Sequence, residues 1–253
     1  MGSTRNDEGP KKFGFMQSEA TLFQELADEL GLIKKPGDGA AWHRHPLAFL
    51  VEAADDICYH VMDVEDGYKT GNLTYDEIEN LHRPWISAER LERGQRIEDR
   101  GRRVEYFRAV TIDVMVRAAV QAFSDNYVGL MDGSFDRELT ASIPRATEFK
   151  AFKDTAKAKV YTARPVVEIE ACGFEVIGGL LASFVGAINV KARNLQQGNA
   201  KSRTLLSLLP AGSPDVRQLA AYERTLIATD YVSGMTDSFA VELYQRIRGI
   251  SLP

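Results

Sequence analysis

The chain has 253 residues with a net charge of -5, and 44% of its residues are hydrophobic. These values are ordinary for a globular protein with a substantial core, in one large or two small domains. The acidic balance argues against a general nucleic-acid binder, and the polar, glycine-rich N-terminal stretch lacks the apolar run of a signal peptide. Cys58 and Cys172 both lie in apolar helical patterns, which predicts buried, reduced thiols in a cytoplasmic protein.

Residues 1–16 show no periodic pattern, and we expect them to form a flexible N-terminal segment. Residues 17–253 are expected to form one helical portion. Its first helix is predicted to begin after Ser18 as N-cap and to stop at Gly31. The predicted apolar face of this helix consists of Leu22, Phe23, Leu26 and Leu30.

The segment from His45 to Asp66 predicts a long helix with two different faces. Pro46 suits its first turn, and Gly71 is expected to follow its end. An apolar stripe is expected to lie in the core; it comprises Leu47, Leu50, Val51, Ala54, Cys58, Val61, Val64 and Tyr68.

Asp55, Tyr59 and Asp63 follow one another at intervals of four residues on this segment. Because each residue of a helix turns by about 100°, four residues advance by about 40°, and the three side chains project into one cleft. A pair such as Asp55-Asp56 is ordinarily surface, but here the apolar flank of the helix predicts burial. Clustered carboxylates repel each other, so a metal ion or arginines from later segments must neutralise them.

Thr74 is predicted to cap a short helix. Residues 87–103 are densely charged, and they form either a solvated helix or loop, or a lid that presents arginines to phosphate. An amphipathic helix over 104–123 follows, then a turn-rich stretch over 125–139 and short helical pieces. The inward residues of the amphipathic helix are expected to be Phe107, Val110, Val114, Ala118 and Phe123.

Two long helices are expected over about 165–195 and about 215–247. In the first, Gly178-Gly179 predicts a close helix crossing or a kink, and Glu175 favours a buried core helix over a membrane span. Its residues at core spacing are Val166, Ile169, Phe174, Ile177, Leu181, Phe184 and Ile188. Since no stretch alternates as a strand would, the sequence predicts an all-α fold.

The histidines offer alternative metal sites. His60 lies four residues after Asp56, which permits a two-ligand metal edge, although a half-exposed histidine is the plainer interpretation. The spacing of His43 and His45 is that of a metal-binding pair. They precede Pro46 in a tight turn, however, which makes a metal site there the less favoured interpretation. The sequence has no Walker loop, no GxGxxG and no cysteine-rich spacing.

Two stretches resemble the deoxyguanosine triphosphate triphosphohydrolases of the HD superfamily: HPLAFLVEAADDICYHVMDVEDGYKTG (45–71) and TDYVSGMTDSFAVELYQRI (229–247). The KKFGFMQSEATLFQELADELGL stretch and the RHPL lead-in are also similar, so the resemblance covers most of the chain from about residue 11. It implies an HD-type helical bundle that hydrolyses dGTP or another dNTP to deoxynucleoside and inorganic triphosphate.

The resemblance also implies roles for individual residues. In this family a divalent metal is held by a His, a His-Asp pair and a later Asp, which falls at Asp55 here, and the metal-bound water attacks the α-phosphorus. A carboxylate ligand suits Mg²⁺ or Mn²⁺. Tyr59 would lie beside the sugar and Asp63 would bind the 3′-hydroxyl. On the C-terminal helix, Arg224 is a candidate for base or phosphate contact and Asp237 a further polar candidate.

The chain departs from the family pattern in its metal ligands. It contains no His-Asp dipeptide, and His43 and His45 match the lead-in and not the ligands. One carboxylate cannot hold a catalytic divalent metal against water. We therefore expect the C-terminal portion of a longer or split enzyme, inactive alone, with no catalytic residue of its own and an incompletely held cofactor. A homo-oligomer or a missing N-terminal half would complete it.

Two other classes of function remain open. The chain could be a non-catalytic assembly or regulatory subunit that binds nucleotide or a single-stranded nucleic acid effector through the cluster from Arg90 to Arg103. A helical carboxylate metalloprotein would require a paired Glu-x-x-His, which the sequence lacks. Lys69 and Arg164 are weaker phosphate candidates. No membrane association is expected.

Overall fold

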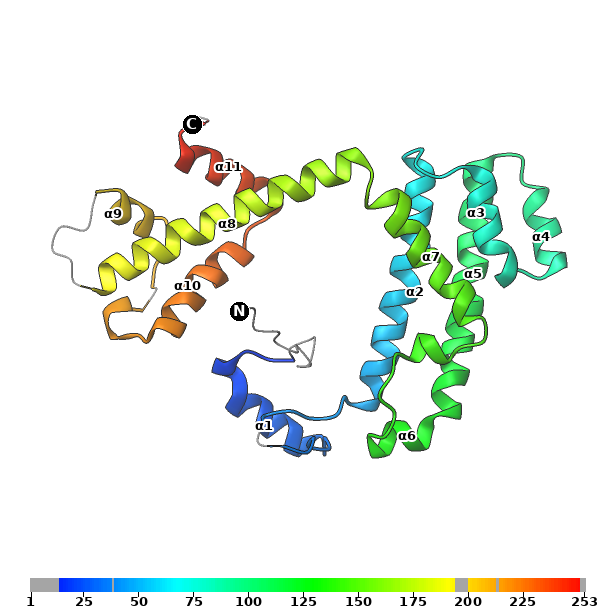
Figure 1. Cartoon of the computed structure of the whole chain (residues 1–253), viewed down its shortest axis with the longest axis horizontal. Coiled ribbons are helices and arrows are strands. Elements are labelled where there is room, and N and C mark those ends of the chain that lie inside the picture. Colours follow the sequence, from blue (N-terminus) through cyan, green and yellow to red (C-terminus); the bar gives the residue numbers. More distant parts are fainter. Residues whose placement is uncertain (1–13, 38, 194–199, 213, 251–253) are drawn as a thin grey trace, which may run out of the picture. The chain divides into compact units, whose positions relative to one another are not determined.

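The computed structural model describes residues 14–37, 39–193, 200–212 and 214–250 (Figure 1). These residues form helices and one isolated antiparallel bridge, between Lys34 and Trp42, and no strand, so the all-α prediction is confirmed. Contacts along the backbone divide the chain into two compact units, Met1–Ala163 (unit 1) and Arg164–Pro253 (unit 2). Of the predicted flexible segment 1–16, residues 1–13 lie outside the described part of the chain. The single helical portion over 17–253 stays a prediction.

Unit 1 begins with the short 3-10 helix η1 (Gln17–Glu19) and with α1 (Ala20–Glu29). Ser18 lies inside η1, so its prediction as the N-cap is wrong. Phe23 stacks on Phe15, with ring centroids 4.2 Å apart, and lies 5.2 Å from the Trp42 ring. The predicted inward face is wrong for three residues that are exposed: Leu22, Leu26 and Leu30.

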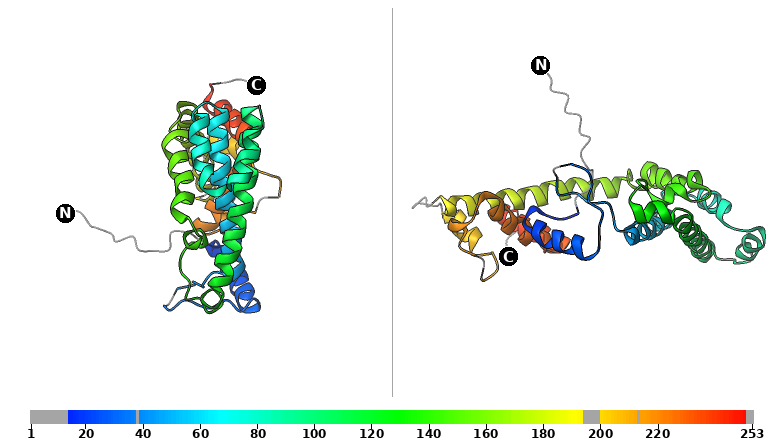
Figure 2. Two further views of the ribbon diagram at one scale, coloured as in Figure 1. Left: turned by 90° about the vertical axis from the view of Figure 1, so that its right-hand side faces the viewer. Right: turned by 90° about the horizontal axis from the view of Figure 1, so that it is seen from below.

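The central helix α2 (Pro46–Lys69) has the predicted bounds. Its start is fixed by Pro46 in the first turn and by Nδ1 of His45, which accepts a hydrogen bond of 3.2 Å from the Leu47 N–H. Gly71, with φ of +77°, follows its end. Helix α2 packs along α5 (Arg100–Asp125), which runs in the opposite direction (Figures 1 and 2).

The buried side of α2 is rotated from the predicted stripe. Val61 and Val64 are buried as predicted, and Leu50 and Tyr68 pack part-buried against the core, but the other core residues of α2 are Phe49, Ala53 and Ile57. Since α2 is apolar on two sides, its periodicity alone does not decide which side packs within this chain. The prediction is wrong for Leu47, Val51, Ala54 and Cys58, which are exposed.

The remaining helices of unit 1 complete its core against α2 and α5. Helix α3 (Tyr75–His82) is capped as predicted, because Oγ1 of Thr74 accepts from the Glu77 N–H at 3.3 Å and the Glu77 carboxylate accepts from the Thr74 N–H at 2.9 Å. The turn-rich stretch contains a short helix, α6. The other elements are η2 (Arg83–Trp85), α4 (Ala88–Gln95), α6 (Tyr127–Asp132), η3 (Leu139–Ser142), α7 (Ala146–Thr155) and the π-helical turn η4 (Ala156–Val160).

A buried carboxylate joins α2 to α5. Glu65 is 2% exposed, and its two oxygens accept hydrogen bonds of 2.9 and 2.7 Å from Arg108. Nζ of Lys69 lies 2.7 Å from the same carboxylate. Glu65 and Arg108 are not among the residues of the predicted acid cluster and its neutralising arginines, so the expectation that later arginines neutralise that cluster stays a prediction. Removing one partner of such a buried pair leaves an unpaired charge and costs roughly 3–5 kcal/mol.

His82 is fully buried between α3 and α5. Its Nδ1 lies 2.7 Å from Oγ1 of Thr111, and its ring lies beside Phe107 and Phe152. Burial lowers the pKa of His82 to about 3. The imidazole is therefore neutral in the folded protein over the whole physiological range.

The neutral state of His82 predicts a loss of stability in mild acid. Because the folded pKa lies below the unfolded value of about 6.5, the unfolded chain takes up the proton first. The free energy of unfolding should therefore fall as the pH drops below 6.5, by about 2 kcal/mol between pH 7 and pH 5 from this residue. His82→Gln cannot take up a proton, so urea unfolding of this variant should show a flatter profile. Identical profiles for the two proteins would contradict this prediction.

Unit 2 is built on α8 (Arg164–Ala192), with α9 (Ala200–Leu206), η5 (Val216–Gln218), α10 (Ala221–Ser233) and α11 (Asp237–Arg248) packed on it (Figure 1). The single helix predicted over 215–247 is wrong, because the chain breaks after Ser233 and Thr236 caps α11. Phe184 and Ile188 are buried as predicted. The core prediction is wrong for Val166, Ile169, Cys172, Phe174 and Ile177, which are exposed.

The predicted close crossing at Gly178-Gly179 is confirmed. A Cβ on Gly179 would lie 2.3 Å from Cε2 of Tyr244 on α11, whereas a Cβ on Gly178 would meet nothing within 4 Å. The absence of a side chain at Gly179 therefore lets α11 approach α8.

Alanine substitutions should separate these two glycines. Gly179→Ala should lower the free energy of unfolding by about 1–3 kcal/mol, because Tyr244 must move. Gly178→Ala is the matched control, and it should be neutral or stabilising by up to about 1 kcal/mol, because alanine favours the helix. Chemical denaturation of both variants measures the difference, and equal effects would contradict the assigned crossing.

Candidate functional site

The outward side of α2 carries the predicted row of acid, phenol and acid. Asp55 is exposed, so the predicted burial is wrong for this residue; Tyr59 is 62% exposed and Asp63 is half-buried. The continuous helix places the three on one side, four residues apart. Around them the same side exposes apolar side chains, namely Leu47, Val51, Cys58 and Met62. Asp55 and Tyr59 thus face outward within unit 1, and their roles stay predictions.

Tyr161 is a member of this group that the sequence did not indicate. Its hydroxyl donates a hydrogen bond to the Asp63 carboxylate. Burial, followed by the bond to Asp63, raises the pKa of Tyr161 above its ordinary value, and the nearby Tyr59 phenol adds to the effect. The two residues are 98 positions apart in the chain, so no local spacing connects them.

The π-helical turn η4 brings Tyr161 to α2. The side chain of Val160 lies so close to Gly67 that a Cβ there would be 2.6 Å from its Cγ2. Lys159 forms an ion pair with Glu77 at the start of α3. These contacts fix the end of η4 against α2, and π-helical turns frequently occur at functional sites. The row contains two acids, Asp55 and Asp63. Within the described part of unit 1, only Asp63 is bound by a side chain from outside α2.

A double-mutant cycle should detect the bond between Tyr161 and Asp63. Because the tyrosine is 39% exposed, Tyr161→Phe and Asp63→Ala should be coupled by only about 0.5–1.5 kcal/mol in the free energy of unfolding. Tyr59→Phe combined with Asp63→Ala is the matched control and should be additive. A cycle in which Tyr161 and Asp63 are also additive would contradict the assigned bond.

Asp56 and His60 lie on the flank of α2 that faces α7 and η3. Burial raises the pKa of Asp56, and its neighbour His60 partly opposes this shift. The His60 ring is half-buried beside Phe149, with centroids 5.6 Å apart. In the part of the chain that the structure describes, no three His, Cys, Asp or Glu side chains gather to hold a metal ion. The plainer interpretation of His60 is thus favoured, and His45 serves as a helix cap.

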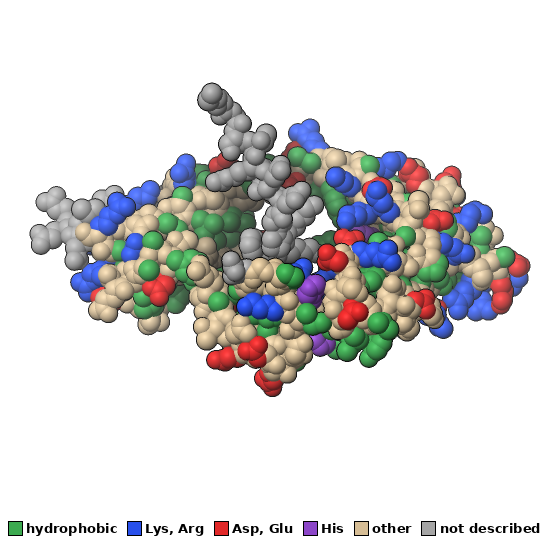
Figure 3. Space-filling model, turned by 60° about the horizontal axis from the view of Figure 1, so that its bottom comes forward, with side chains coloured by type: hydrophobic (Ala, Val, Ile, Leu, Met, Phe, Trp, Pro, Cys, Tyr) green, Lys and Arg blue, Asp and Glu red, His purple; other side chains and the backbone are tan. Residues whose placement is uncertain are grey.

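Most arginines of α4 and the start of α5 are engaged with neighbours. Arg103 donates to the Ile97 carbonyl at 2.6 Å and to the Tyr75 hydroxyl at 3.1 Å. Over this part of unit 1, basic and acidic side chains are interspersed (Figure 3). This arrangement favours the solvated helix over a phosphate-binding lid. The ion pairs are Arg90–Asp113, Arg93–Glu89 and Arg96–Glu92.

The candidates in unit 2 lie on two helices, and not on one as predicted. Arg224 on α10 donates to Oδ1 of Asn189 on α8 at 3.1 Å and to the Leu219 carbonyl at 2.6 Å. This part-buried guanidinium therefore ties α10 to α8. Asp237 is exposed in the first turn of α11, where a carboxylate stabilises the helix N-terminus.

The two weaker phosphate candidates are also engaged. Lys69 lies beside Glu65 and is 3.7 Å from Asp66. Arg164 lies 2.8 Å from Glu168, one turn further along α8. Each cation is therefore already matched with a carboxylate.

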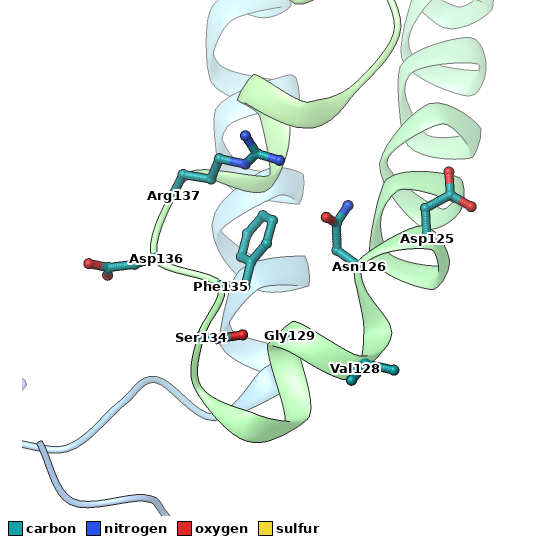
Figure 4. A pocket seen from close by; sticks show the side chains of 8 residues that line it. All are labelled: Asp125, Asn126, Val128, Gly129, Ser134, Phe135, Asp136 and Arg137. Atoms are coloured by element: carbon teal, nitrogen blue, oxygen red, sulfur yellow. The ribbon is translucent and has the colours of Figure 1, made fainter.

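A pocket of about 520 Å³ opens beside the end of α5 and the loop after α6 (Figure 4). Phe135 forms part of its wall and contacts Phe49 edge to face at 5.4 Å, while Nδ2 of Asn126 donates to the Ala122 carbonyl at 2.7 Å. None of the predicted site residues lines this pocket. Its lining residues are Asp125, Asn126, Val128, Gly129, Ser134, Phe135, Asp136 and Arg137.

Comparisons with known proteins identify the relatives of this chain. Residues 139–246 match the family described as phosphohydrolase-associated domain. A deoxyguanosinetriphosphate triphosphohydrolase-like protein of Synechocystis sp. is 34% identical over 242 residues, which is 96% of this chain and 53% of the relative. The chain is a relative of the deoxyguanosinetriphosphate triphosphohydrolase-like proteins. The resemblance predicted from the sequence motifs is therefore confirmed.

Two further dGTP triphosphohydrolase-like relatives give the same result. The protein of Pseudomonas aeruginosa is 31% identical over 247 residues, covering 96% of this chain and 55% of the relative. That of Listeria monocytogenes is 28% identical over 265 residues, covering 95% of this chain and 55% of the relative. The chain thus spans about half the length of the curated relatives it matches.

Proposed function

We propose that this chain is one portion of an enzyme that hydrolyses dGTP, or another dNTP, to deoxynucleoside and inorganic triphosphate. The names of its relatives and the phosphohydrolase-associated domain support a phosphohydrolase. The observation that carries the proposal is the outward side of α2, where Asp55, Tyr59 and Asp63 lie within an uncovered apolar surface. Exposed apolar surfaces of this kind mark sites of interaction. Further polypeptide would therefore cover this side and complete a nucleotide site there.

In this proposal the row supplies part of the site. Asp55 is one ligand of Mg²⁺ or Mn²⁺, whose preferred ligands are oxygens, Tyr59 lies beside the sugar, and Asp63 accepts from the 3′-hydroxyl. For Arg224 and Asp237, the family resemblance alone supports a contact with substrate. The described residues do not form a complete metal site, so this chain fits the metal only in part and no catalytic step is assigned to it. We place the enzyme in the cytoplasm.

The isolated chain should not release triphosphate from dGTP. With Mg²⁺ or Mn²⁺, its rate should equal that of the Asp55→Ala chain, because one carboxylate does not hold the ion. A malachite-green assay coupled to a pyrophosphatase that cleaves triphosphate measures this rate. Release by the wild-type chain above that of Asp55→Ala would contradict its inactivity.

In a longer protein that supplies the remaining ligands, Asp55→Ala should lower the rate by about 100-fold or more. Asp154→Ala is the control, since Asp154 is an exposed acid on a different helix, α7, and it should keep a rate near that of the wild type. Equal rates in wild type and Asp55→Ala would rule out Asp55 as a ligand.

A further inference from the structure

A pocket of about 520 Å³ lies outside the row proposed on α2, beside the end of α5 and the loop after α6. Its volume lies in the range of small-molecule sites. On one wall, the Phe135 ring is fixed because it packs edge to face on the buried ring of Phe49. On the other wall, Nδ2 of Asn126 donates to the Ala122 carbonyl, which fixes the amide. Figure 4 shows the ring and the amide facing each other across the opening.

Two polar groups of this pocket keep bonding capacity for a ligand. The bond from Nδ2 of Asn126 leaves Oδ1 of the amide as an acceptor, on the side toward Phe135 (Figure 4). The Arg137 guanidinium lies 5.4 Å from the centroid of the Phe135 ring, and it forms no ion pair with another described residue. Its position is restrained because the Arg137 carbonyl accepts a hydrogen bond of 3.4 Å from Arg44. A ligand therefore meets an aromatic face, one acceptor and one set of N–H donors.

The charges of the pocket disfavour strongly charged ligands. The lining residues carry two carboxylates, Asp125 and Asp136, against the one guanidinium of Arg137. Both carboxylates point away from the space between Phe135 and Asn126, so they lie at its edge (Figure 4). A phosphate at this edge is repelled by the two acids, and a cation placed over the Phe135 ring is repelled by Arg137. The pocket is therefore suited to an uncharged, planar molecule with both donors and acceptors.

We propose that this pocket binds a guanine nucleoside without phosphates. The base stacks on Phe135, as bases do on aromatic side chains. Its O6 and N7 accept from Arg137, the contact that arginine commonly makes with guanine, and its N1–H donates to Oδ1 of Asn126. Adenine carries an amino donor in place of O6, so it cannot accept from Arg137 there. The proposal is one of binding, and it does not depend on the chemistry proposed for α2.

Titration of the full chain with deoxyguanosine tests the site, because this nucleoside is uncharged. Ligand-observed NMR should show saturable binding. Deoxyadenosine should bind at least about 10-fold more weakly, since it lacks the pair of acceptors that faces Arg137. Deoxyguanosine monophosphate should also bind more weakly than deoxyguanosine, because its phosphate approaches the acids at the edge of the pocket.

Four variants locate the bound nucleoside. Arg137→Ala should weaken deoxyguanosine binding about 10-fold or more, because it removes the donors to O6 and N7. Arg102→Ala is the matched control, an exposed arginine at the other end of α5, and it should bind as the wild type does. Asp136→Asn should strengthen binding of the monophosphate and leave that of deoxyguanosine unchanged, a gain that misfolding cannot produce. Tyr59→Ala should have no effect, because the pocket and not α2 holds the nucleoside. Circular dichroism should show that all four variants keep the wild-type helix content.

Four results would overturn the proposal. The first is a wild-type chain that shows no saturable binding of deoxyguanosine. The second is equal affinity for deoxyadenosine, because stacking without recognition of guanine would then explain the binding. The third is tighter binding of the monophosphate than of the nucleoside, because the pocket would then favour an anion. The fourth is full affinity in Arg137→Ala or lost affinity in Tyr59→Ala, because the nucleoside would then bind elsewhere. None of these measurements tests triphosphate release, so the function proposed for α2 stands or falls separately.

Discussion

The packing of α2 against α5 is the constraint from which the rest of unit 1 follows. It buries Phe49, Ile57 and Val61, and it places the Glu65 carboxylate in the interior, where Arg108 and Lys69 neutralise it. A buried carboxylate requires such partners. Rotating α2 would expose the apolar residues and separate the ion pair. The inner side of the helix is therefore fixed, and the row of Asp55, Tyr59 and Asp63 must project from the other side.

Local end signals in the sequence predicted the bounds of α2 and the start of α3, but the N-cap predicted at Ser18 is wrong. Pro46 and Gly71 bound α2, and Thr74 caps α3, because these residues act on the backbone of their own turn. Prediction from the sequence failed where burial depends on distant partners. Both α2 and α8 are apolar beyond the surface that this chain covers, so periodicity indicated the helix but not the side that packs. The break between α10 and α11 escaped the pattern because apolar spacing continues across it.

The candidate site was predicted only as far as one helix could show it. Intervals of four residues placed Asp55, Tyr59 and Asp63 on one side of α2, but Tyr161 reaches Asp63 through a π-helical turn distant in sequence. Arg224 was predicted to contact substrate from the family resemblance. Its hydrogen bonds to Asn189 and Leu219 also give it a structural part in unit 2, which only the fold reveals.

The central claim is that further polypeptide covers the outward side of α2, and the reactivity of Cys58 tests it most directly. This exposed thiol lies on that side and falls between Asp55 and Tyr59 in the sequence. The measurement is the rate at which Ellman's reagent modifies Cys58 in a Cys172→Ser background, in the isolated native chain and in the longer protein. The account predicts fast modification of the isolated chain, near the rate of the unfolded chain, and strong protection in the longer protein. Slow modification of the isolated chain, or equal rates in both, would contradict it.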